Sequence, residues 1–221
     1  LDYEKTLKEL RKSLEGADDG ELFIESTRGE GLTYDDGKLR NATYNSSEGF
    51  GLRAVSGDIT GYAHSSTIDE AALRTAVKTV RLAINELKTP VEPPQKTDRK
   101  LYSSDDPMIS VTFHNKVETL KTIDDFARSL DKRVVQVSAS FGASLQQISI
   151  LRVEGALTSD IRPMARINIS IIVEHNGRRE SGSSGAGGRF DLGSIITEAS
   201  WKLHVKEALR IALVNLRSIP T

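Results

Sequence analysis

The sequence predicts an α+β fold, in which helices pack against antiparallel strands. Apolar residues occupy every second position from Ile167 to Val173, which is the period of a strand with one buried face. Asn176-Gly177 follows and supplies two residues that tolerate the positive φ of a type I′ hairpin turn. Several other segments carry apolar residues at helical spacing. Because a hairpin joins antiparallel neighbours, helices combined with antiparallel sheets are the expected architecture.

The predicted hairpin over 165–190 joins an ordinary strand to a strand of very small residues. With a two-residue turn, Glu174 lies opposite Arg179, and such an ion pair contributes roughly 0.2–1 kcal/mol and helps to fix the register. The return strand contains GSSGAGG (182–188). A strand this poor in side chains packs weakly, so its backbone is expected to meet another chain, a ligand or a tightly packed helix.

A second hairpin is predicted over 48–65, with Ser56-Gly57 as its turn. In that register three cross-strand pairs share one buried face, namely Ala54–Ile59, Leu52–Gly61 and Phe50–Ala63. A capping-box pattern then begins a helix over 69–87. Earlier in the chain the pattern predicts a helix over 3–14 and strands over 21–26 and 39–46.

The segment 88–100 contains three prolines and no apolar period, so it is the best candidate for a boundary. We therefore predict an N-terminal α+β unit over 1–90, a linker over 91–107 and a central α+β unit over 108–221. The elements expected in the central unit are a helix over 117–130, two strands within 133–155 that turn near 142–144, the hairpin 165–190 and a C-terminal helix over 195–216.

The composition of the 221 residues, 38% hydrophobic and 28% charged, is ordinary for a globular protein. A net charge of −1 gives no electrostatic reason to bind nucleic acid. There is no cysteine, which excludes disulfides and thiolate ligands and fits a reducing compartment. No apolar run approaches the about 20 residues of a membrane span, and no signal peptide is visible. The chain begins with Leu1 rather than Met, which leaves its natural start open.

No catalytic or metal-binding constellation emerges from the residues alone. The four histidines, His64, His114, His175 and His204, form no HExxH pair and are expected on surfaces or helix faces. Serines are abundant near 181–184, but there is no GxSxG elbow. Carboxylate pairs such as Asp35-Asp36 are sequence neighbours that do not face each other, so they indicate turns and caps.

The glycine run 182–188 lacks the Gly-Lys-Ser/Thr of a phosphate loop, because Arg189-Phe190 follows it. Two interpretations remain: a loosely packed strand and bend, or a backbone surface that meets a substrate or partner. Under the second interpretation the candidate substrate-binding residues are Gly182, Gly185, Gly187, Gly188 and Arg189. Arg189 would then hold a peptide carboxylate or carbonyl, whereas the plain alternative is a surface salt bridge.

Five segments carry a wider resemblance: SSEGFGLRAVSGDITGYAHSSTI (46–68), LYSSDDP (101–107), DKRVVQVSAS (131–140), the hairpin 165–190 and EALRIALVNL (207–216). In this order they resemble the TldD/PmbA family of metallopeptidases, also called modulators of DNA gyrase, and specifically its TldD branch. The resemblance covers nearly the whole chain, although no single segment is a catalytic signature.

The resemblance implies a cytoplasmic zinc metallopeptidase that degrades or processes unfolded peptides or small proteins. Its metal motif, a helical His-Glu-x-x-x-His, and a later thiolate lie beyond the part that EALRIALVNL matches, so no catalytic residue or metal ligand is assigned here. The chain is expected to be an N-terminal, non-catalytic portion that serves as scaffold and substrate enclosure. The implied partners are its own C-terminal domain, a PmbA (TldE) subunit or a second copy, and a peptide substrate.

Two other readings stay open beside this one. A regulatory protein-binding module without proteolysis would suit the gyrase-modulator label. An unrelated α+β enzyme is disfavoured, because no site can be assigned to it.

Overall fold

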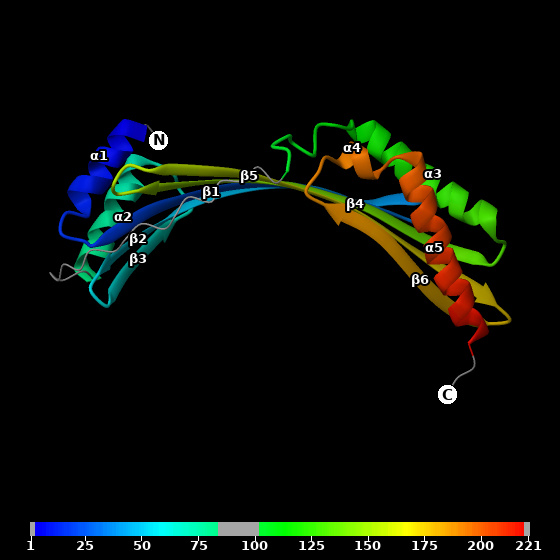
Figure 1. Ribbon diagram of the computed structural model, residues 1–221. Coiled ribbons are helices and arrows are strands. Elements are labelled where there is room, and N and C mark those ends of the chain that lie inside the picture. Colours follow the sequence, from blue (N-terminus) through cyan, green and yellow to red (C-terminus); the bar gives the residue numbers. More distant parts are fainter. Residues whose placement is uncertain (1–2, 84–101, 219–221) are drawn as a thin grey trace. The chain divides into compact units, whose positions relative to one another are not determined.

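The structure is a computed structural model that describes residues 3–83 and 102–218 (Figure 1). Its elements, in chain order, are α1 (Tyr3–Ser13), β1 (Asp19–Asp35), β2 (Lys38–Ser56), β3 (Ile59–Ser65), α2 (Glu70–Ala83), α3 (Phe113–Leu130), β4 (Val134–Arg152), β5 (Leu157–His175), β6 (Arg178–Gly188), α4 (Leu192–Ile195) and α5 (Glu198–Arg217). The strands form one sheet in the order β3-β2-β1-β4-β5-β6. The predicted α+β class is confirmed.

The described residues belong to two compact units, which we call unit 1 and unit 2. Unit 1 comprises residues 1–27, 46–100 and 146–161, and unit 2 comprises residues 28–45, 101–145 and 162–221. The four strands β1, β2, β4 and β5 each supply residues to both units. The units are therefore not consecutive along the sequence, and the proline-rich segment 88–100 lies outside the described residues.

Several strands are longer than the sequence pattern predicts. The strand predicted over 21–26 is part of β1, and the strand predicted over 39–46 continues through the second hairpin as β2. The turn predicted near 142–144 is wrong, because β4 runs unbroken through it. Alternate residues stay buried there, so the small side chains of this stretch lie within a paired strand rather than a loop.

Unit 1 packs α1 and α2 against its strands. The buried residues of this core are Leu10, Leu14, Leu22, Phe50, Leu52, Ala54, Leu73, Ala76, Val77, Val80 and Leu151. They include Leu10 and Leu14 of the helix predicted over 3–14, and Leu73, Val77 and Val80 of the helix predicted over 69–87, so both helices are confirmed where the structure describes them. Within residues 3–83 and 102–218, no helix is long and apolar enough to cross a membrane.

The second hairpin exists, but its predicted register is wrong by two residues. The turn is Gly57-Asp58 instead of Ser56-Gly57, so Ala54 pairs with Gly61 and Leu52 with Ala63. Gly57 takes a φ of 56°, which glycine adopts without steric cost. Because a shift of two residues preserves the side-chain face, Leu52 and Ala54 still reach the core.

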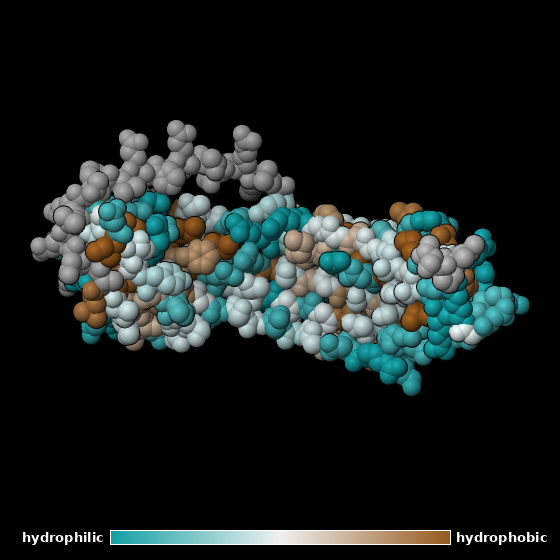
Figure 2. All heavy atoms as spheres, turned by 90° about the horizontal axis from the view of Figure 1, so that it is seen from below, coloured by the Kyte–Doolittle hydropathy of each residue, from teal (hydrophilic) through white to brown (hydrophobic). Residues whose placement is uncertain are grey.

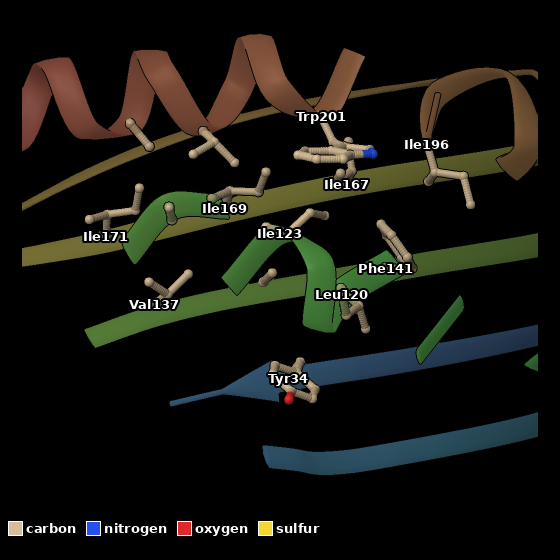
Figure 3. Packing of buried hydrophobic residues seen from close by; sticks show 14 of the residues in the cluster. Tyr34, Leu120, Ile123, Val137, Phe141, Ile167, Ile169, Ile171, Ile196 and Trp201 are labelled. Atoms are coloured by element: carbon tan, nitrogen blue, oxygen red, sulfur yellow. The ribbon is translucent and has the colours of Figure 1, made fainter. Parts of the chain in front are cut away.

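Unit 2 packs α3, α4 and α5 on one face of its strands (Figure 3). The β5 residues Ile167, Ile169 and Ile171 are fully buried beneath these helices. Trp201 of α5 meets Phe126 of α3 edge to face, with ring centroids 5.5 Å apart. The predicted helices over 117–130 and 195–216 are confirmed, although the second begins at Glu198 after the short α4.

The central hairpin is confirmed in detail. Asn176 and Gly177 have φ values of 51° and 79°, as a type I′ turn requires. Glu174 pairs with Arg179, whose Nε donates to the carboxylate at 2.6 Å. The local sequence therefore determines both the turn and the register of β5 and β6.

Candidate functional site

β6 is an edge strand of the sheet, and it contains four of the five predicted substrate-binding residues. Alternate residues of a strand face opposite sides. Gly182, Ser184 and Ala186 pair with the buried Ile171, Ile169 and Ile167, so they face the helices. Gly185 and Gly187 belong to the alternate set and face the other side, which we call the open face of unit 2.

Gly182 is buried against α5 rather than presented to a ligand. A methyl group at this position would overlap the Ala208 carbonyl oxygen and the Ala212 amide nitrogen. The absence of a side chain therefore lets α5 approach the strand closely, which is one of the three explanations that the sequence left open for the glycine run. Nearby, Ser184 Oγ and His204 Nδ1 of α5 form a hydrogen bond of 2.9 Å.

The open face near β6 is polar and built from small side chains. A hollow of about 360 Å³ lies there, over β4, β5 and β6. Its lining residues are Ser138, Ser140, Arg166, Asn168, Ile169, Ser170, Ser183, Ser184 and Gly185. Arg166 Nε donates to Asn168 Oδ1 at 2.9 Å, so an arginine is held over this face. Figure 2 looks onto the molecule from this side and shows mainly pale and hydrophilic atoms over the strands of unit 2.

The outer edge of β6 presents main-chain groups. In an antiparallel ladder, alternate residues direct both their N–H and C=O groups away from the neighbouring strand. The Ser181 carbonyl oxygen accepts a hydrogen bond of 2.9 Å from Asn215 Nδ2 of α5, which marks Ser181 as a member of the outward set. Ser183, Gly185 and Gly187 follow in the same set.

Beyond β6 no further strand continues the sheet in the described part of the chain. Natural edge strands usually carry charges, prolines or bulges that discourage pairing with another chain. The stretch from Ser181 to Gly188 has no charged residue and no proline. This edge is therefore chemically able to accept an extended segment as an added strand.

The end of the glycine run is shaped by aromatic side chains. A methyl group on Gly188 would overlap the ring of Phe190, so this ring lies directly against the strand. The Arg189 guanidinium lies 5.0 Å from the centre of the Tyr102 ring, a cation–π arrangement that holds it beside the strand end. Arg189 is exposed, so its charge stays available to an anion or a carbonyl group.

Sequence reasoning missed the residues that lock β6 to the end of α5. Arg178 donates to the carbonyl oxygens of Ser218 and Asn215, at 2.6 and 3.0 Å. A cation at a helix C-terminus satisfies its last carbonyls and complements its dipole. In the sequence, this contact is indicated only by an arginine next to the hairpin turn, and such an arginine could equally be an ordinary surface residue.

The described residues do not fit a zinc site. They contain no group of three or more His, Cys, Asp or Glu side chains that could hold a metal ion. His204 is hydrogen-bonded to Ser184, His64 stacks on Tyr62, and His114 and His175 are exposed. No chemical step is therefore assigned to a metal in this chain.

Solved structures share this fold. A proposed modulator of a DNA gyrase from Thermotoga maritima superposes with a TM-score of 0.78 at 17% identity, over 99% of this chain and 49% of that chain. A proposed gyrase modulator from Bacteroides thetaiotaomicron gives 0.72 at 17% identity, over 96% and 50%. TldE from Thermococcus kodakarensis gives 0.71 at 16% identity, over 94% and 47%. The sheet and its helices therefore define a protein of the gyrase-modulator and TldE fold.

Sequence profiles name the family. "PmbA/TldA metallopeptidase domain 1" matches residues 20–84, and "PmbA/TldA metallopeptidase central domain" matches residues 106–216. The chain belongs to the PmbA/TldD family of metallopeptidases. It is 34% identical over 210 residues to a "Metalloprotease TldD homolog" of Haemophilus influenzae, which covers 91% of this chain and 44% of that protein. A homolog of the same name from Buchnera aphidicola subsp. Acyrthosiphon pisum is 35% identical over 210 residues. The chain thus spans less than half the length of these relatives.

Proposed function

We propose that this chain is the N-terminal, non-catalytic portion of a TldD-like zinc metallopeptidase of the cytoplasm, and that its β6 edge holds an extended peptide substrate. The relatives named as TldD metalloproteases support the enzyme class. The zinc and its ligands would belong to the portion of those relatives that this chain does not span. In this proposal the present chain binds the substrate, and the portion that it does not span hydrolyses it.

The observation that carries this proposal is the outward set of main-chain groups on β6. An unfolded peptide has no fixed side-chain pattern, but it always has N–H and C=O groups in register with a strand. Ser183, Gly185 and Gly187 would supply the partners, and their small side chains leave the approach open. Arg189, at the end of the run, would bind a carboxylate or carbonyl of that peptide.

The proposed assembly pairs this subunit with a PmbA (TldE)-like subunit or with a second copy. TldE from Thermococcus kodakarensis has the same fold in this region, and two chains of one fold commonly assemble around a symmetry axis.

The earlier division into units over 1–90 and 108–221 also remains a proposal, beside the two units that the contacts define.

A second candidate function is a regulatory module that binds a protein target without proteolysis. The gyrase-modulator descriptions of two structural neighbours favour it. A net charge of −1 argues for a protein target over direct contact with DNA.

The test joins this chain to the remainder of its natural reading frame, where we expect a His-Glu-x-x-x-His motif downstream of residue 221. Ser183→Pro removes the outward N–H of β6, whereas the matched control Ser183→Ala keeps it. Cleavage of an unfolded peptide should fall about fivefold to thirtyfold in the proline variant only, because a lost main-chain hydrogen bond and its neighbours are worth roughly 1–2 kcal/mol. Zinc content and melting temperature serve as readouts of intact folding.

The outcomes separate the two candidate functions. Cleavage that a chelator abolishes supports the peptidase, and unchanged cleavage in Ser183→Pro rejects the β6 edge as the binding surface. A complete protein that binds a protein target and cleaves no peptide supports the regulatory module. Gly185 is unsuitable for this test, because a side chain there would overlap the Ile167 carbonyl oxygen and disturb the strand pairing itself.

A further inference from the structure

The hollow on the open face of unit 2 carries a positive charge that has no counter-ion in the described part of the chain. Among the described residues that line it, Arg166 of β5 is basic and none is acidic. Arg166 Nε donates to the neutral Asn168, and its two Nη groups contact no carboxylate of a described residue. On the same face of β5, Glu174 is already paired with Arg179. An anion is therefore the ligand that this charge favours.

Serine hydroxyls from three strands line the same hollow. Ser138 and Ser140 come from β4, Ser170 from β5 and Ser183 from β6. Those of β4 and β5 alternate with buried residues, and Ser183 pairs with Ser170, so these side chains lie on the open face. None of these hydroxyls forms a hydrogen bond with another residue that the structure describes. Each can donate to an oxyanion and so supplement the guanidinium.

Two glycines of β6 keep the way from Arg166 to the edge of the sheet open. Gly187 pairs with Arg166, and Gly185 pairs with Asn168. A methyl group on Gly187 would lie 3.3 Å from Arg166 Cβ and Cγ, and one on Gly185 would lie 3.0 Å from Asn168 Oδ1. The β5 side chains therefore lie close beside the glycines, and neither glycine has a side chain that would separate them from the edge.

We propose that this hollow binds an acidic side chain, aspartate or glutamate, of the extended peptide that pairs with β6; this inference rests on the proposed function. An added strand presents alternate side chains on the same face as Gly185 and Gly187. It lies roughly 10 Å from β5, because neighbouring strands are about 4.8 Å apart. A long arginine side chain and a carboxylate side chain together span this distance over the glycines. The Nη groups of Arg166 then donate to the carboxylate.

The hollow discriminates between side chains by charge. A glutamate gains charge-assisted hydrogen bonds from Arg166, whereas a glutamine of the same size gains only neutral ones. A lysine is repelled by Arg166 and meets no carboxylate among the described lining residues. Pairing with the β6 main chain accepts any sequence, so the hollow would add a preference for an acidic residue at one position of the peptide.

The experiment titrates the ¹⁵N-labelled 221-residue chain with acetyl-Thr-Val-Glu-Val-Thr-amide at low salt. The matched probe has glutamine in place of glutamate, and both peptides are capped so that no terminal carboxylate competes. Both should shift the amide signals of Gly185 and Gly187, and the glutamate peptide should also shift that of Ser170. We expect the glutamate peptide to bind about threefold to tenfold more tightly than the glutamine peptide. Added salt should reduce the difference.

The decisive variant is Arg166→Gln, which should abolish the preference for the glutamate peptide. Arg166→Lys keeps the charge but loses the paired N–H donors, so it should retain only part of the preference. The matched control is Arg210→Gln, which removes an exposed arginine of α5 outside the hollow and should retain the whole preference. The control therefore separates a contact in the hollow from a general effect of net charge.

The outcomes separate this inference from the proposed function. If both peptides bind at β6 with equal affinity, or if Arg210→Gln lowers the preference as much as Arg166→Gln, the hollow does not select an acidic side chain and the inference is wrong. If neither peptide shifts the β6 signals, the β6 edge is rejected as the binding surface, and the inference is rejected with it. Inorganic phosphate is titrated in parallel. Phosphate shifts in the hollow, together with equal binding of the two peptides, would assign the hollow to a free anion and overturn the inference.

Discussion

Gly182 of β6 lies directly beneath Ala208 of α5, so closely that a methyl group on the glycine would overlap the alanine carbonyl oxygen. The contact is with the backbone of the helix, which cannot move aside as a flexible side chain can. The glycine run therefore contains residues with different functions. Gly182 permits helix packing, whereas Gly185 and Gly187 face the open side of the sheet.

The contact predicts that Gly182→Ala destabilises the protein. Overpacking at this helix–strand interface should lower the free energy of unfolding by about 1–3 kcal/mol, measured by urea denaturation. The matched control is Gly142→Ala in β4, where a methyl group would meet no other atom within 4 Å. Equal stability of the two variants would show that α5 does not require a glycine at position 182.

The buried Lys116 of α3 leads to a second prediction. Only 2% of its side chain is exposed, and its ammonium pairs with Glu30 of β1 and donates to the Met108 carbonyl oxygen at 2.7 Å. Lys116→Met leaves the Glu30 carboxylate without its partner, which should cost on the order of 3 kcal/mol. The double variant Lys116→Met/Glu30→Met should recover part of this loss in the same urea titration, whereas an additive loss would contradict the pairing.

A third prediction concerns pH. Arg133 donates side-chain and backbone hydrogen bonds to Asp131 at the end of α3, and they hold the pKa of this carboxyl at about 2, below the ordinary 3.8. Because the folded-state pKa lies below the unfolded one, the stabilisation is present above pH 3.8 and is lost as the pH falls toward 2. The carboxylate is 18% exposed, so solvent screening limits the effect to about 1 kcal/mol.

The measurement compares the unfolding free energies of wild type and Asp131→Asn between pH 2 and pH 6. The two should differ by about 1 kcal/mol at pH 6 and converge as the pH approaches 2. Arg133→Met should reduce this pH dependence without abolishing it, because it removes the side-chain donors and leaves the backbone N–H of residue 133 bonded to Asp131. Parallel curves over the whole range would show that this pair does not affect stability.

The central turn allows a fourth prediction, in which backbone conformation outweighs charge. Gly177→Ala places a side chain at a φ of 79° and should destabilise by about 1–2 kcal/mol. Arg179→Gln removes an ion pair whose arginine is 69% exposed, which should cost at most about 1 kcal/mol. Thermal unfolding compares the melting temperatures of the two variants. A larger loss in Arg179→Gln than in Gly177→Ala would mean that the ion pair, not the turn, sets the register.

The sequence by itself determined the features that depend on near neighbours. The alternation from Ile167 to Val173 and the Asn176-Gly177 turn were enough to predict the β5–β6 hairpin and its Glu174–Arg179 pair. The helical stripes were enough to predict α1, α3 and most of α5. These features follow from side-chain periodicity and from local backbone preferences, which a single sequence displays directly.

Tertiary structure decided those features for which the local sequence pattern allows more than one conformation. Turns at Ser56-Gly57 and at Gly57-Asp58 bury the same strand face, because registers that differ by two residues share their side-chain parity. The stretch 142–144 looks like a turn, yet neighbours on both sides keep it within β4. Gly182 and Gly185 are identical in sequence terms, and only the approach of α5 gives them different environments. Long-range packing determines the register of the hairpin, the continuity of β4 and the environment of each glycine, and none of these can be inferred from residue type alone.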